Sequence, residues 1–344
     1  MKKKLGPIRD RLVNRLSGID VRATANAVNE AVAQEQVWRE IASQRQEIAH
    51  ARQVLAESLQ ADRESVNQWQ AAADVQLREI FAQVEFASRR QHVLLEALKI
   101  ERDHIPELQT RLSAVRETAE YRGVHDLKDP LVSVRIATFD KTEELMDVAI
   151  ASVLAQSYEN FEIVVVNDGP NEKTRRAVIG LNDMRVRYAE LPERGRYPSD
   201  PHSKWMVAGS PAMNRAASLC EGAWIAPLDD DDEFTADHIE KLVILGNKNR
   251  AELSYGALIQ RNLKEGGEKK IWSSPPAISE FSFQGAIYLR LLNFFQYDQQ
   301  SWLTEEPGDW NLIRRMSLAG VNMACTQDVV AIMNMVPYTL KDAK

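Results

Sequence analysis

The first third of the chain has a hydrophobic pattern that is typical of long α-helices. No glycine occurs between Gly18 and Gly123, and Pro106 is the only proline in that stretch. Ala, Gln, Glu, Arg and Leu predominate there, and all of them favour helix. Apolar residues recur at helical spacing: Ile41, Ile48, Leu55, Leu59, Val66, Trp69, Ala73, Leu77, Ile80 and Val84, then Leu94, Leu98, Ile105, Leu108, Leu112, Val115 and Ala119.

Part of this pattern keeps the seven-residue step of a coiled-coil seam. The positions in step are Leu98, Ile105, Leu112 and Ala119. Asp62 stands where the seam expects an apolar residue, and Pro106 lacks a backbone N–H, so a kink or break is expected there. We expect two or more helical segments that assemble a homo-oligomer. A helical hairpin that folds back on the same chain is the alternative, and periodicity does not separate the two.

Residues 1–18 form a basic segment in a chain that is acidic overall. Six Lys and Arg side chains stand there against Asp10 alone. Leu5, Ile8, Leu12 and Leu16 fall on one helical face. A basic amphipathic helix of this kind binds anionic membrane surfaces. A helix that packs its apolar side on a neighbour has the same pattern, so peripheral membrane contact is one of two hypotheses.

From about Gly123 the pattern changes to short β-branched runs that alternate with helical stretches, which is typical of an α/β fold. Residues 132–137 and 161–166 are predicted strands, and residues 145–156 are a predicted helix between them. A strand, a helix and a strand in this order begin a mostly parallel sheet that is flanked by helices. We therefore expect a helical, coiled-coil region over residues 1–122 and an α/β domain over residues 123–344.

Composition and charge limit the classes of function. The formal net charge of −7 over 344 residues argues against nucleic-acid binding, which normally needs a basic surface. Cys220 and Cys325 are the only cysteines and have no metal-ligand spacing, which fits a reducing compartment. No apolar run reaches the ~20 residues that span a bilayer. The expected location is the cytoplasm, with the inner face of the membrane as the alternative.

Five segments of residues 130–335 resemble glycosyltransferase family 2. They are VSVRIATFD (132–140), AIASVLAQSY (149–158), FEIVVVNDG (161–169), GAWIAPLDDDDEF (222–234) and EEPGDWNLIRRM (305–316). Their order and spacing are similar to those of the family, whereas the helical first third has no part in the resemblance. The resemblance implies a GT-A fold, the α/β fold of nucleotide-diphospho-sugar transferases, with an acceptor-facing C-terminal portion.

Thr138, Asp140 and Asp168 lie at the ends of the first two predicted strands. In the family the matching positions line the pocket for the base and ribose of the nucleotide, so the resemblance assigns these three residues to the nucleotide-sugar donor. Physically, a carboxylate at a strand end can accept a hydrogen bond from the N–H of a base. Taken alone, Asp168 followed by Gly169 would indicate only an Asx turn.

The acidic run 229–233 follows an apolar strand. Adjacent carboxylates repel one another unless a cation neutralises them. Oxygen ligands without a nearby thiolate suit Mn²⁺ or Mg²⁺, which also bridge substrate phosphates. The resemblance assigns Asp229 and Asp231 to the metal and Asp229 and Asp230 to the ribose and diphosphate. The alternative is a solvated acidic turn that caps a helix from about Ala236, and Asp232 and Glu233 fit that role in either case.

Asp309 matches the family position whose carboxylate removes the proton from the acceptor hydroxyl. A helix predicted from about Trp310 would place Asp309 at its N-terminus, where the helix dipole lowers the pKa and weakens a base. An ordinary N-cap is the alternative, and both roles are compatible. Gly308 stands where the family often has Glu, so Glu305 or Glu306 is a candidate substitute.

Two further segments depart from the family pattern. Met213 replaces an arginine that is frequent in the family, and the loop 193–205 is longer and more basic than usual. Arg194, Arg196 and Lys204 of this loop are candidates for contact with a diphosphate or an anionic acceptor. Solvated loop charges are the simpler interpretation.

Together these features predict a metal-dependent, inverting glycosyltransferase. It would move a sugar from a nucleotide-sugar donor to a hydroxyl of a glycan, lipid-linked or protein acceptor, in the synthesis of cell-surface glycans or glycoconjugates. The alternative is a coiled-coil scaffold or regulator that carries a degenerate transferase domain. The joint presence of Asp168, Asp229, Asp231 and Asp309 argues against degeneracy.

Overall fold

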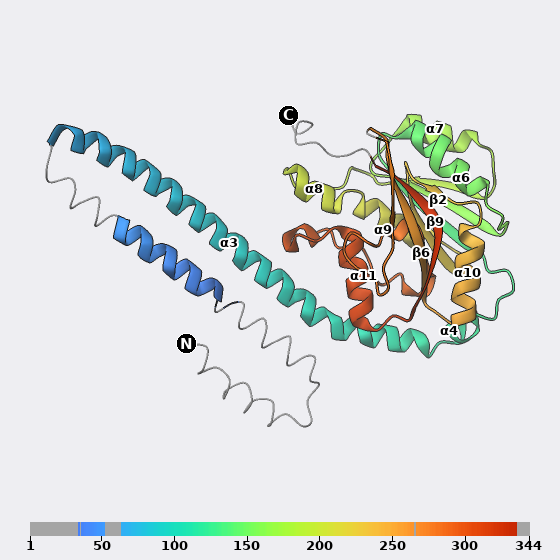
Figure 1. Cartoon of the computed structure of the whole chain (residues 1–344). Helices are drawn as coiled ribbons and strands as arrows, with labels where there is room; N and C mark the ends of the chain where they lie inside the picture. Colours follow the sequence, from blue (N-terminus) through green and yellow to red (C-terminus); the bar gives the residue numbers. More distant parts are fainter. Residues whose placement is uncertain (1–33, 35, 52–62, 265, 336–344) are drawn as a thin grey trace, which may run out of the picture. The chain divides into compact units, whose positions relative to one another are not determined.

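The computed structural model describes residues 34, 36–51, 63–264 and 266–335, which form parts of two compact units that divide between His92 and Val93 (Figure 1). The basic segment 1–18 lies outside the described residues. The expected domain boundary at residues 122 and 123 separates two sequence patterns and stays a prediction. No helix among the described residues is long and apolar enough to cross a membrane.

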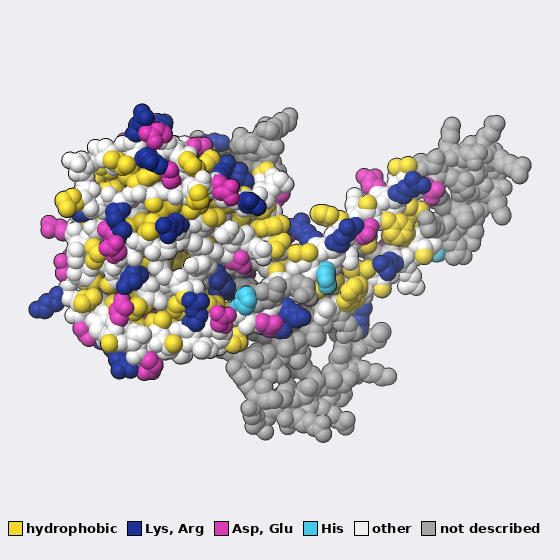
Figure 2. Space-filling model, turned by 180° about the vertical axis from the view of Figure 1, so that it is seen from behind, with side chains coloured by type: hydrophobic (Ala, Val, Ile, Leu, Met, Phe, Trp, Pro, Cys, Tyr) yellow, Lys and Arg dark blue, Asp and Glu magenta, His cyan; other side chains and the backbone are white. Residues whose placement is uncertain are grey.

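The N-terminal unit contains two antiparallel helical segments. Residues 36–51 are helical, and α3 extends from Arg63 to Arg116, so the part of α3 up to His92 belongs to this unit. Residues 37–51 and residues 77–91 line the same groove, so these segments lie side by side as in the helical-hairpin alternative. Helix α3 continues through Pro106, so the expected break is absent. Large apolar side chains remain exposed on this unit, among them Trp38, Phe81 and Phe86. Figure 2 shows apolar side chains among the charged ones on the surface of the helical part.

The C-terminal unit is built on one sheet in the order β3-β2-β1-β4-β8-β6-β9-β5, with β7 paired to β6. The first four strands are parallel, and the rest of the sheet is mixed. The strands are β1 (Val132–Thr138), β2 (Phe161–Asn167), β3 (Val186–Glu190), β4 (Trp224–Asp229), β5 (Glu233–Phe234), β6 (Leu253–Asn262), β7 (Glu268–Ile271), β8 (Ala286–Leu289) and β9 (Met323–Met335).

Helices cover both faces of this sheet (Figure 1). They are α4 (Ala119–Val124), α5 (Thr142–Glu144), the π-helix η1 (Leu145–Ile150), α6 (Ala151–Leu154), α7 (Glu172–Gly180), α8 (Pro201–Val207), α9 (Ser210–Leu219), α10 (His238–Asn249) and α11 (Gly308–Ala319), with 3₁₀ turns η2 (Phe283–Gly285), η3 (Arg290–Leu292) and η4 (Ser301–Thr304). The helix predicted over residues 145–156 is present as α5, η1 and α6, and it starts and ends earlier than expected.

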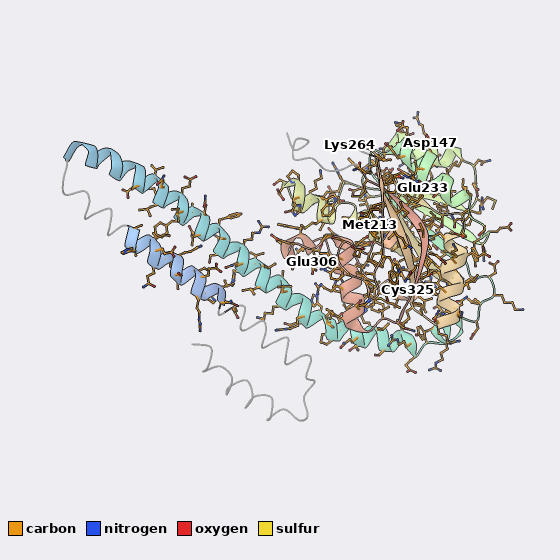
Figure 3. The ribbon with its side chains drawn as sticks, in the orientation of Figure 1. Asp147, Met213, Glu233, Lys264, Glu306 and Cys325 are labelled. Carbon is orange, nitrogen blue, oxygen red and sulfur yellow. The ribbon has the colours of Figure 1, made fainter. Side chains whose placement is uncertain are left out.

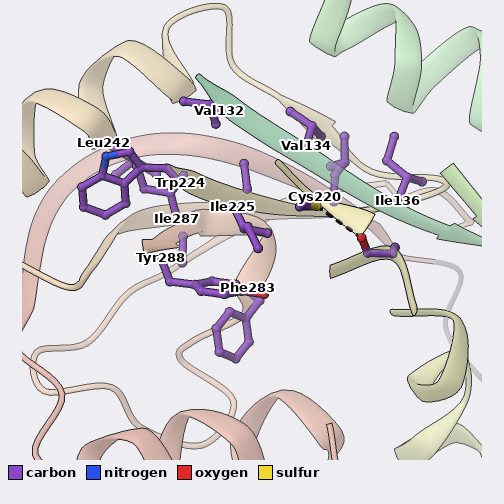
Figure 4. Close-up of a cluster of buried hydrophobic side chains, with 14 of the residues drawn as sticks. Val132, Val134, Ile136, Cys220, Trp224, Ile225, Leu242, Phe283, Ile287 and Tyr288 are labelled. Atoms are coloured by element: carbon purple, nitrogen blue, oxygen red, sulfur yellow. Dashed lines mark hydrogen bonds between the residues drawn. The ribbon is translucent and has the colours of Figure 1, made fainter. Parts of the chain in front are cut away.

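The core lies between the sheet and these helices. Val132, Val134 and Ile136 of β1 are fully buried beside Trp224 and Ile225 of β4 (Figure 4). Helix α10 approaches β4 closely because residue 246 is glycine: a Cβ atom there would lie 2.5 Å from Cη2 of Trp224. All residues of β1 and β2 and most of β4 are buried, which explains why these strands are mostly apolar in sequence.

The end of α3 is joined to the sheet by a buried ion pair. Arg116 Nε and Nη2 donate to the two carboxylate oxygens of Glu252 at 2.7 and 2.8 Å. Glu252 is fully buried and also accepts from Tyr121 OH at 2.8 Å and from the backbone N–H of Asn322 at 2.7 Å. The last turns of α3 therefore belong to the C-terminal unit.

Candidate active site

The acidic run lies where β4 ends, and its side chains alternate in exposure. Asp229 and Asp231 are partly exposed, whereas Asp230 and Asp232 are buried. Asp232 accepts a hydrogen bond from the backbone N–H of Asn334 at 2.7 Å, which ties the run to β9. The alternation leaves Asp229 and Asp231 accessible to a ligand.

The expected helix-capping role of the run is wrong. Helix α10 begins at His238, its N-cap residue is Asp237, and no side chain caps it. Asp232 binds β9 instead. Glu233 lies on β5 and pairs with Arg261 Nη1 at 2.6 Å. Both side chains are thus engaged in joining the end of β4 to the far half of the sheet.

Asp230 is held by the end of β1. Thr138 Oγ1 donates to Asp230 Oδ2 at 2.8 Å, and the backbone N–H of Phe139 donates to the same oxygen at 3.4 Å. Lys141 Nζ lies 3.3 Å from Asp230 Oδ1 and 2.6 Å from Asp231 Oδ2. Burial raises the pKa of Asp230, and the opposing effects of Lys141 and Thr138 offset only part of this rise. Thr138 therefore positions a carboxylate of the acidic run, and sequence reasoning missed Lys141.

Asp229 ends β4 and Asp309 lies in α11, so the two residues are far apart in the sequence. Ser282 and the 3₁₀ turn η2 that follows it connect the two carboxylates. Gln284 Nε2 donates to Asp229 Oδ2. Ser282 Oγ donates to Asp309 Oδ2 at 2.6 Å, and the backbone N–H of Phe283 donates to the same oxygen at 3.0 Å. Burial and the neighbouring charge of Asp309 raise the pKa of Asp229, while Arg135 acts in the opposite direction.

Asp309 lies in the first turn of α11, as expected from the sequence, but it does not cap that helix. The N-cap residue is Pro307, and no side chain caps the helix there. The carboxylate turns to residues 282–283 and to Tyr297, whose OH donates to Asp309 Oδ1 at 2.9 Å. The N-cap alternative is therefore wrong, and the carboxylate is bound by Ser282, Phe283 and Tyr297 instead.

A buried arginine lies behind this tyrosine. Arg135 of β1 is 1% exposed, and its Nη2 donates to Tyr297 OH at 2.8 Å. Its Nε and Nη1 find no hydrogen-bond acceptor among the described residues. Burial and the charge of Asp309 raise the pKa of Tyr297 far above its ordinary value, so the phenol stays neutral. An arginine inside an apolar strand was the available sequence signal for this network.

The residues assigned to the nucleotide differ in exposure. Asp140 is exposed at the end of β1 in a left-handed conformation (φ 56°), and Asn171 Nδ2 donates to its Oδ1 at 3.2 Å. Asp168 is 3% exposed, and both of its carboxylate oxygens accept from the basic loop: from Gly195 N–H at 2.8 Å and from Tyr197 OH at 2.6 Å. Contact between Asp168 and a base would require this loop to move.

The basic loop places one of its three candidate cations near this pocket. The Arg194 guanidinium stacks over the Phe139 ring at 3.6 Å, and its Nε lies 4.0 Å from Asp168 Oδ2. Arg196 is exposed and pairs with Glu193 at 3.8 Å. Lys204 lies in the last turn of α8. Arg194 is thus the loop cation that the fold brings to the ends of β1 and β2.

Glu306, a proposed substitute for the family's glutamate, packs at the start of α11 (Figure 3). Its carboxylate accepts from Asn311 Nδ2 at 2.9 Å and from Arg314 Nε at 2.8 Å. These contacts fix the first turns of the helix that carries Asp309. Met213 lies on α9 and packs against the core, in place of the arginine frequent in the family.

The side chains of this site offer the kind of ligand atom that a hard divalent cation prefers. Asp229 and Asp231 offer oxygen ligands on the accessible side of the run, and oxygen ligands are those that Mn²⁺ and Mg²⁺ prefer. Within the described ranges, no three His, Cys, Asp or Glu side chains are grouped so as to hold a metal by themselves. Phosphate oxygens and water are further ligands that such a cation takes.

Comparison with known proteins identifies the class. The family described as Glycosyl transferase family 2 matches residues 133–199 and 202–318, which make up more than half of the chain. The chain belongs to glycosyl transferase family 2. The expected enzyme class and the α/β fold of GT-A type are confirmed at this level.

Several curated bacterial proteins are similar to this chain. The glycosyl transferase WcaA of Escherichia coli K12, named for colanic acid biosynthesis, is 31% identical over 36% of this chain and 39% of its own length. The UDP-Glc:alpha-D-GlcNAc-diphosphoundecaprenol beta-1,3-glucosyltransferase WfgD of Escherichia coli is 28% identical over 38% of this chain and 46% of its own.

A third relative is the GalNAc(5)-diNAcBac-PP-undecaprenol beta-1,3-glucosyltransferase of Campylobacter jejuni. It is 27% identical over 42% of this chain and 42% of its own length. The chain therefore spans less than half of the length of each of these three relatives.

Proposed function

We propose that the chain is a metal-dependent, inverting glycosyltransferase that uses a nucleotide-sugar donor. The observation that carries this proposal is the bridge from Ser282 to Gln284, which holds Asp309 and Asp229 on either side of one short turn. A base for the acceptor and a carboxylate of the donor site are thereby kept close together. A single base that is fixed opposite the donor site favours inversion, by the geometric reasoning that separates inverting from retaining glycosidases.

In the proposed reaction Asp309 accepts the proton of the acceptor hydroxyl. The hydroxyl oxygen forms the new bond to the anomeric carbon of the sugar while the bond to the nucleoside diphosphate breaks. Tyr297 OH and Ser282 Oγ donate to the Asp309 carboxylate at 2.9 and 2.6 Å and orient it. Positioning a base in this way contributes about 10²–10⁴-fold to a rate.

Asp229 and Asp231 would hold the divalent cation, Mn²⁺ or Mg²⁺. When bound, the cation supplies Lewis-acid stabilisation of the leaving diphosphate. Asp230, held by Thr138 at 2.8 Å, would then face the ribose and diphosphate from the buried side of the run. Asp140 and Asp168 would line the nucleotide pocket, with Arg194 beside them.

The acceptor is proposed to be a lipid-linked glycan of cell-surface synthesis. This rests on the two relatives that are named for undecaprenol-linked substrates. Peripheral contact with the inner face of the membrane, through residues 1–18, would bring the protein to such an acceptor. The exposed apolar side chains of the N-terminal unit, among them Trp38 and Phe86, support assembly of a homo-oligomer through its helices.

A thermal-shift screen of nucleotide sugars, with and without Mn²⁺, tests the donor site, because a ligand that binds only the native state raises Tm. The expected result is a shift that needs Mn²⁺ and disappears in Asp231→Ala. Lys173→Met, which removes an exposed cation paired with Glu143, is the matched control and should keep the shift. A protein that responds to no donor would favour the alternative, a scaffold with a degenerate transferase domain.

A further inference from the structure

Lys141 places a positive charge inside the acidic run. It follows the end of β1 and directly precedes α5. Its Nζ lies 2.6 Å from Asp231 Oδ2 and 3.3 Å from Asp230 Oδ1, so the ammonium group is shared by two adjacent carboxylates. The backbone leading to it is anchored as well, since the N–H of Phe139 donates to Asp230.

This ammonium group occupies oxygens that a divalent cation would need. Asp231 is the carboxylate expected to bind the metal, and its Oδ2 is the atom nearest to Lys141 Nζ. The ammonium group of Lys141 lies within ion-pair distance of both Asp231 and Asp230, at 2.6 and 3.3 Å, so its charge balances part of the charge of the run. A divalent cation that binds Asp231 must therefore displace a charged competitor that is tethered to the same site.

Two other donors near the run have fixed partners. Arg135 is buried on the Asp229 side, where it donates to Tyr297. The backbone N–H of Asn334 holds Asp232 from β9. Lys141, by contrast, is 45% exposed and lies on a long, flexible side chain, which leaves it free to turn toward a ligand that approaches from solvent.

We propose that Lys141 is a built-in counter-ion that holds Asp231 until the donor arrives and then moves to the donor's diphosphate. This inference rests on the proposed function. It makes binding of the cation and of the diphosphate mutually dependent: the free protein binds the cation weakly, and the diphosphate favours cation binding by drawing Lys141 away from Asp231. Lys141 is thus both a competitor of the metal and a ligand of the diphosphate.

The first test measures binding of Mn²⁺ alone by electron paramagnetic resonance titration. Lys141→Met should bind Mn²⁺ about 10- to 100-fold more tightly than the wild type, which corresponds to the loss of one hydrogen bond between charged groups. Lys141→Arg should stay close to the wild type because it keeps the charge. Lys173→Met is the matched control and should not change Mn²⁺ affinity, because the ammonium group of Lys173 pairs with Glu143, at 2.5 Å.

The second test uses nucleoside diphosphates at saturating Mn²⁺, with UDP, GDP, ADP and CDP as probes. Here Lys141→Met should weaken binding of the nucleotide that stabilises the wild type, by about 10-fold or more. The two effects have opposite signs, whereas a merely structural ion pair would weaken both kinds of binding. Both measurements are repeated on Lys141→Gln in case Lys141→Met folds poorly. The unfolding transition of Lys141→Gln shows whether this variant is folded.

Unchanged or weaker Mn²⁺ affinity in both Lys141→Met and Lys141→Gln would overturn the inference. The Asp231→Asn variant distinguishes failure of the counter-ion role from failure of the proposed function. If Asp231→Asn abolishes Mn²⁺ binding while the Lys141 variants leave it unchanged, the cation site stands and the counter-ion role falls. If no variant binds Mn²⁺ even with nucleoside diphosphate present, the cation site itself is refuted, and the counter-ion role falls with it.

Discussion

Removal of Arg116 is expected to destabilise the C-terminal unit strongly. Glu252 is fully buried, and Arg116 supplies two of the four hydrogen bonds to its carboxylate. Breaking a buried ion pair from one side costs about 3–5 kcal/mol. The Arg116 side chain is 36% exposed, so water reaches part of the site, and we expect Arg116→Met to cost about 2–3 kcal/mol at pH 7.

The pH dependence of this loss has a definite sign. Burial raises the pKa of Glu252, but Arg116 and the other donors lower it below its ordinary value of 4.5. The ionised carboxylate therefore stabilises the fold above that pH, and this contribution is lost as the pH falls through the folded-state pKa. Without Arg116 the carboxyl is protonated more easily, so the deficit of the variant should shrink as the pH falls below about 5.

Urea unfolding followed by circular dichroism at pH 7 and pH 4.5 measures both effects. Arg122→Met is the matched control, because its partner Glu117 lies at 2.8 Å but both side chains are mostly exposed, and such pairs are worth at most about 1 kcal/mol. Adding Glu252→Gln to Arg116→Met should recover part of the loss. A deficit below about 0.5 kcal/mol at pH 7, or one that does not shrink in acid, would refute the reasoning.

Three further predictions concern buried side chains. Burial lowers the pKa of His238 to about 3, so stability should fall by about 2 kcal/mol between pH 7 and pH 5, and His238→Asn should show a smaller fall in urea unfolding. Gly246→Ala should cost about 1–3 kcal/mol in the same assay because its Cβ would lie 2.5 Å from Trp224; an unchanged transition would argue against that packing. Tyr297→Phe should lower the transfer rate and leave donor affinity unchanged, because it removes the hydrogen bond to Asp309 and the acceptor of the buried Arg135. Equal loss of transfer rate and donor affinity would indicate a structural role.

The elements that place the site were predictable because their signals are local. Strands β1, β2 and β4 are apolar runs that end at polar residues, and α11 begins at Gly308, close to the expected start. Asp229 and Asp231 are the partly exposed carboxylates among the four aspartates of the run, and their role as metal ligands stays a prediction. The family resemblance assigns Asp309 and the acidic run to one site, whereas periodicity gives no such indication.

Contacts between distant segments were not predictable. Lys141 and Asp231 are ninety residues apart, and only the parallel pairing of β1 with β4 brings their neighbourhoods together. Gln284 lies in the 3₁₀ turn η2, and Ser282 is the residue before this turn. No periodic pattern in the sequence predicts their contacts. The break expected at Pro106 is absent for a different reason: α3 is long, and the hydrogen bonds of its neighbouring turns maintain the helix despite one missing donor.

In the proposed mechanism the cation site at Asp231 and the base Asp309 act on one donor in separate roles. The most direct measurement is release of nucleoside diphosphate from the donor found by thermal shift, combined with calorimetric donor binding, for the wild type, Asp231→Asn and Asp309→Asn. We predict that Asp231→Asn loses both donor binding and turnover, while Asp309→Asn binds the donor normally and loses turnover by about 10²-fold or more. Full turnover by Asp309→Asn, or Mn²⁺-dependent donor binding that survives in Asp231→Asn, would contradict this account.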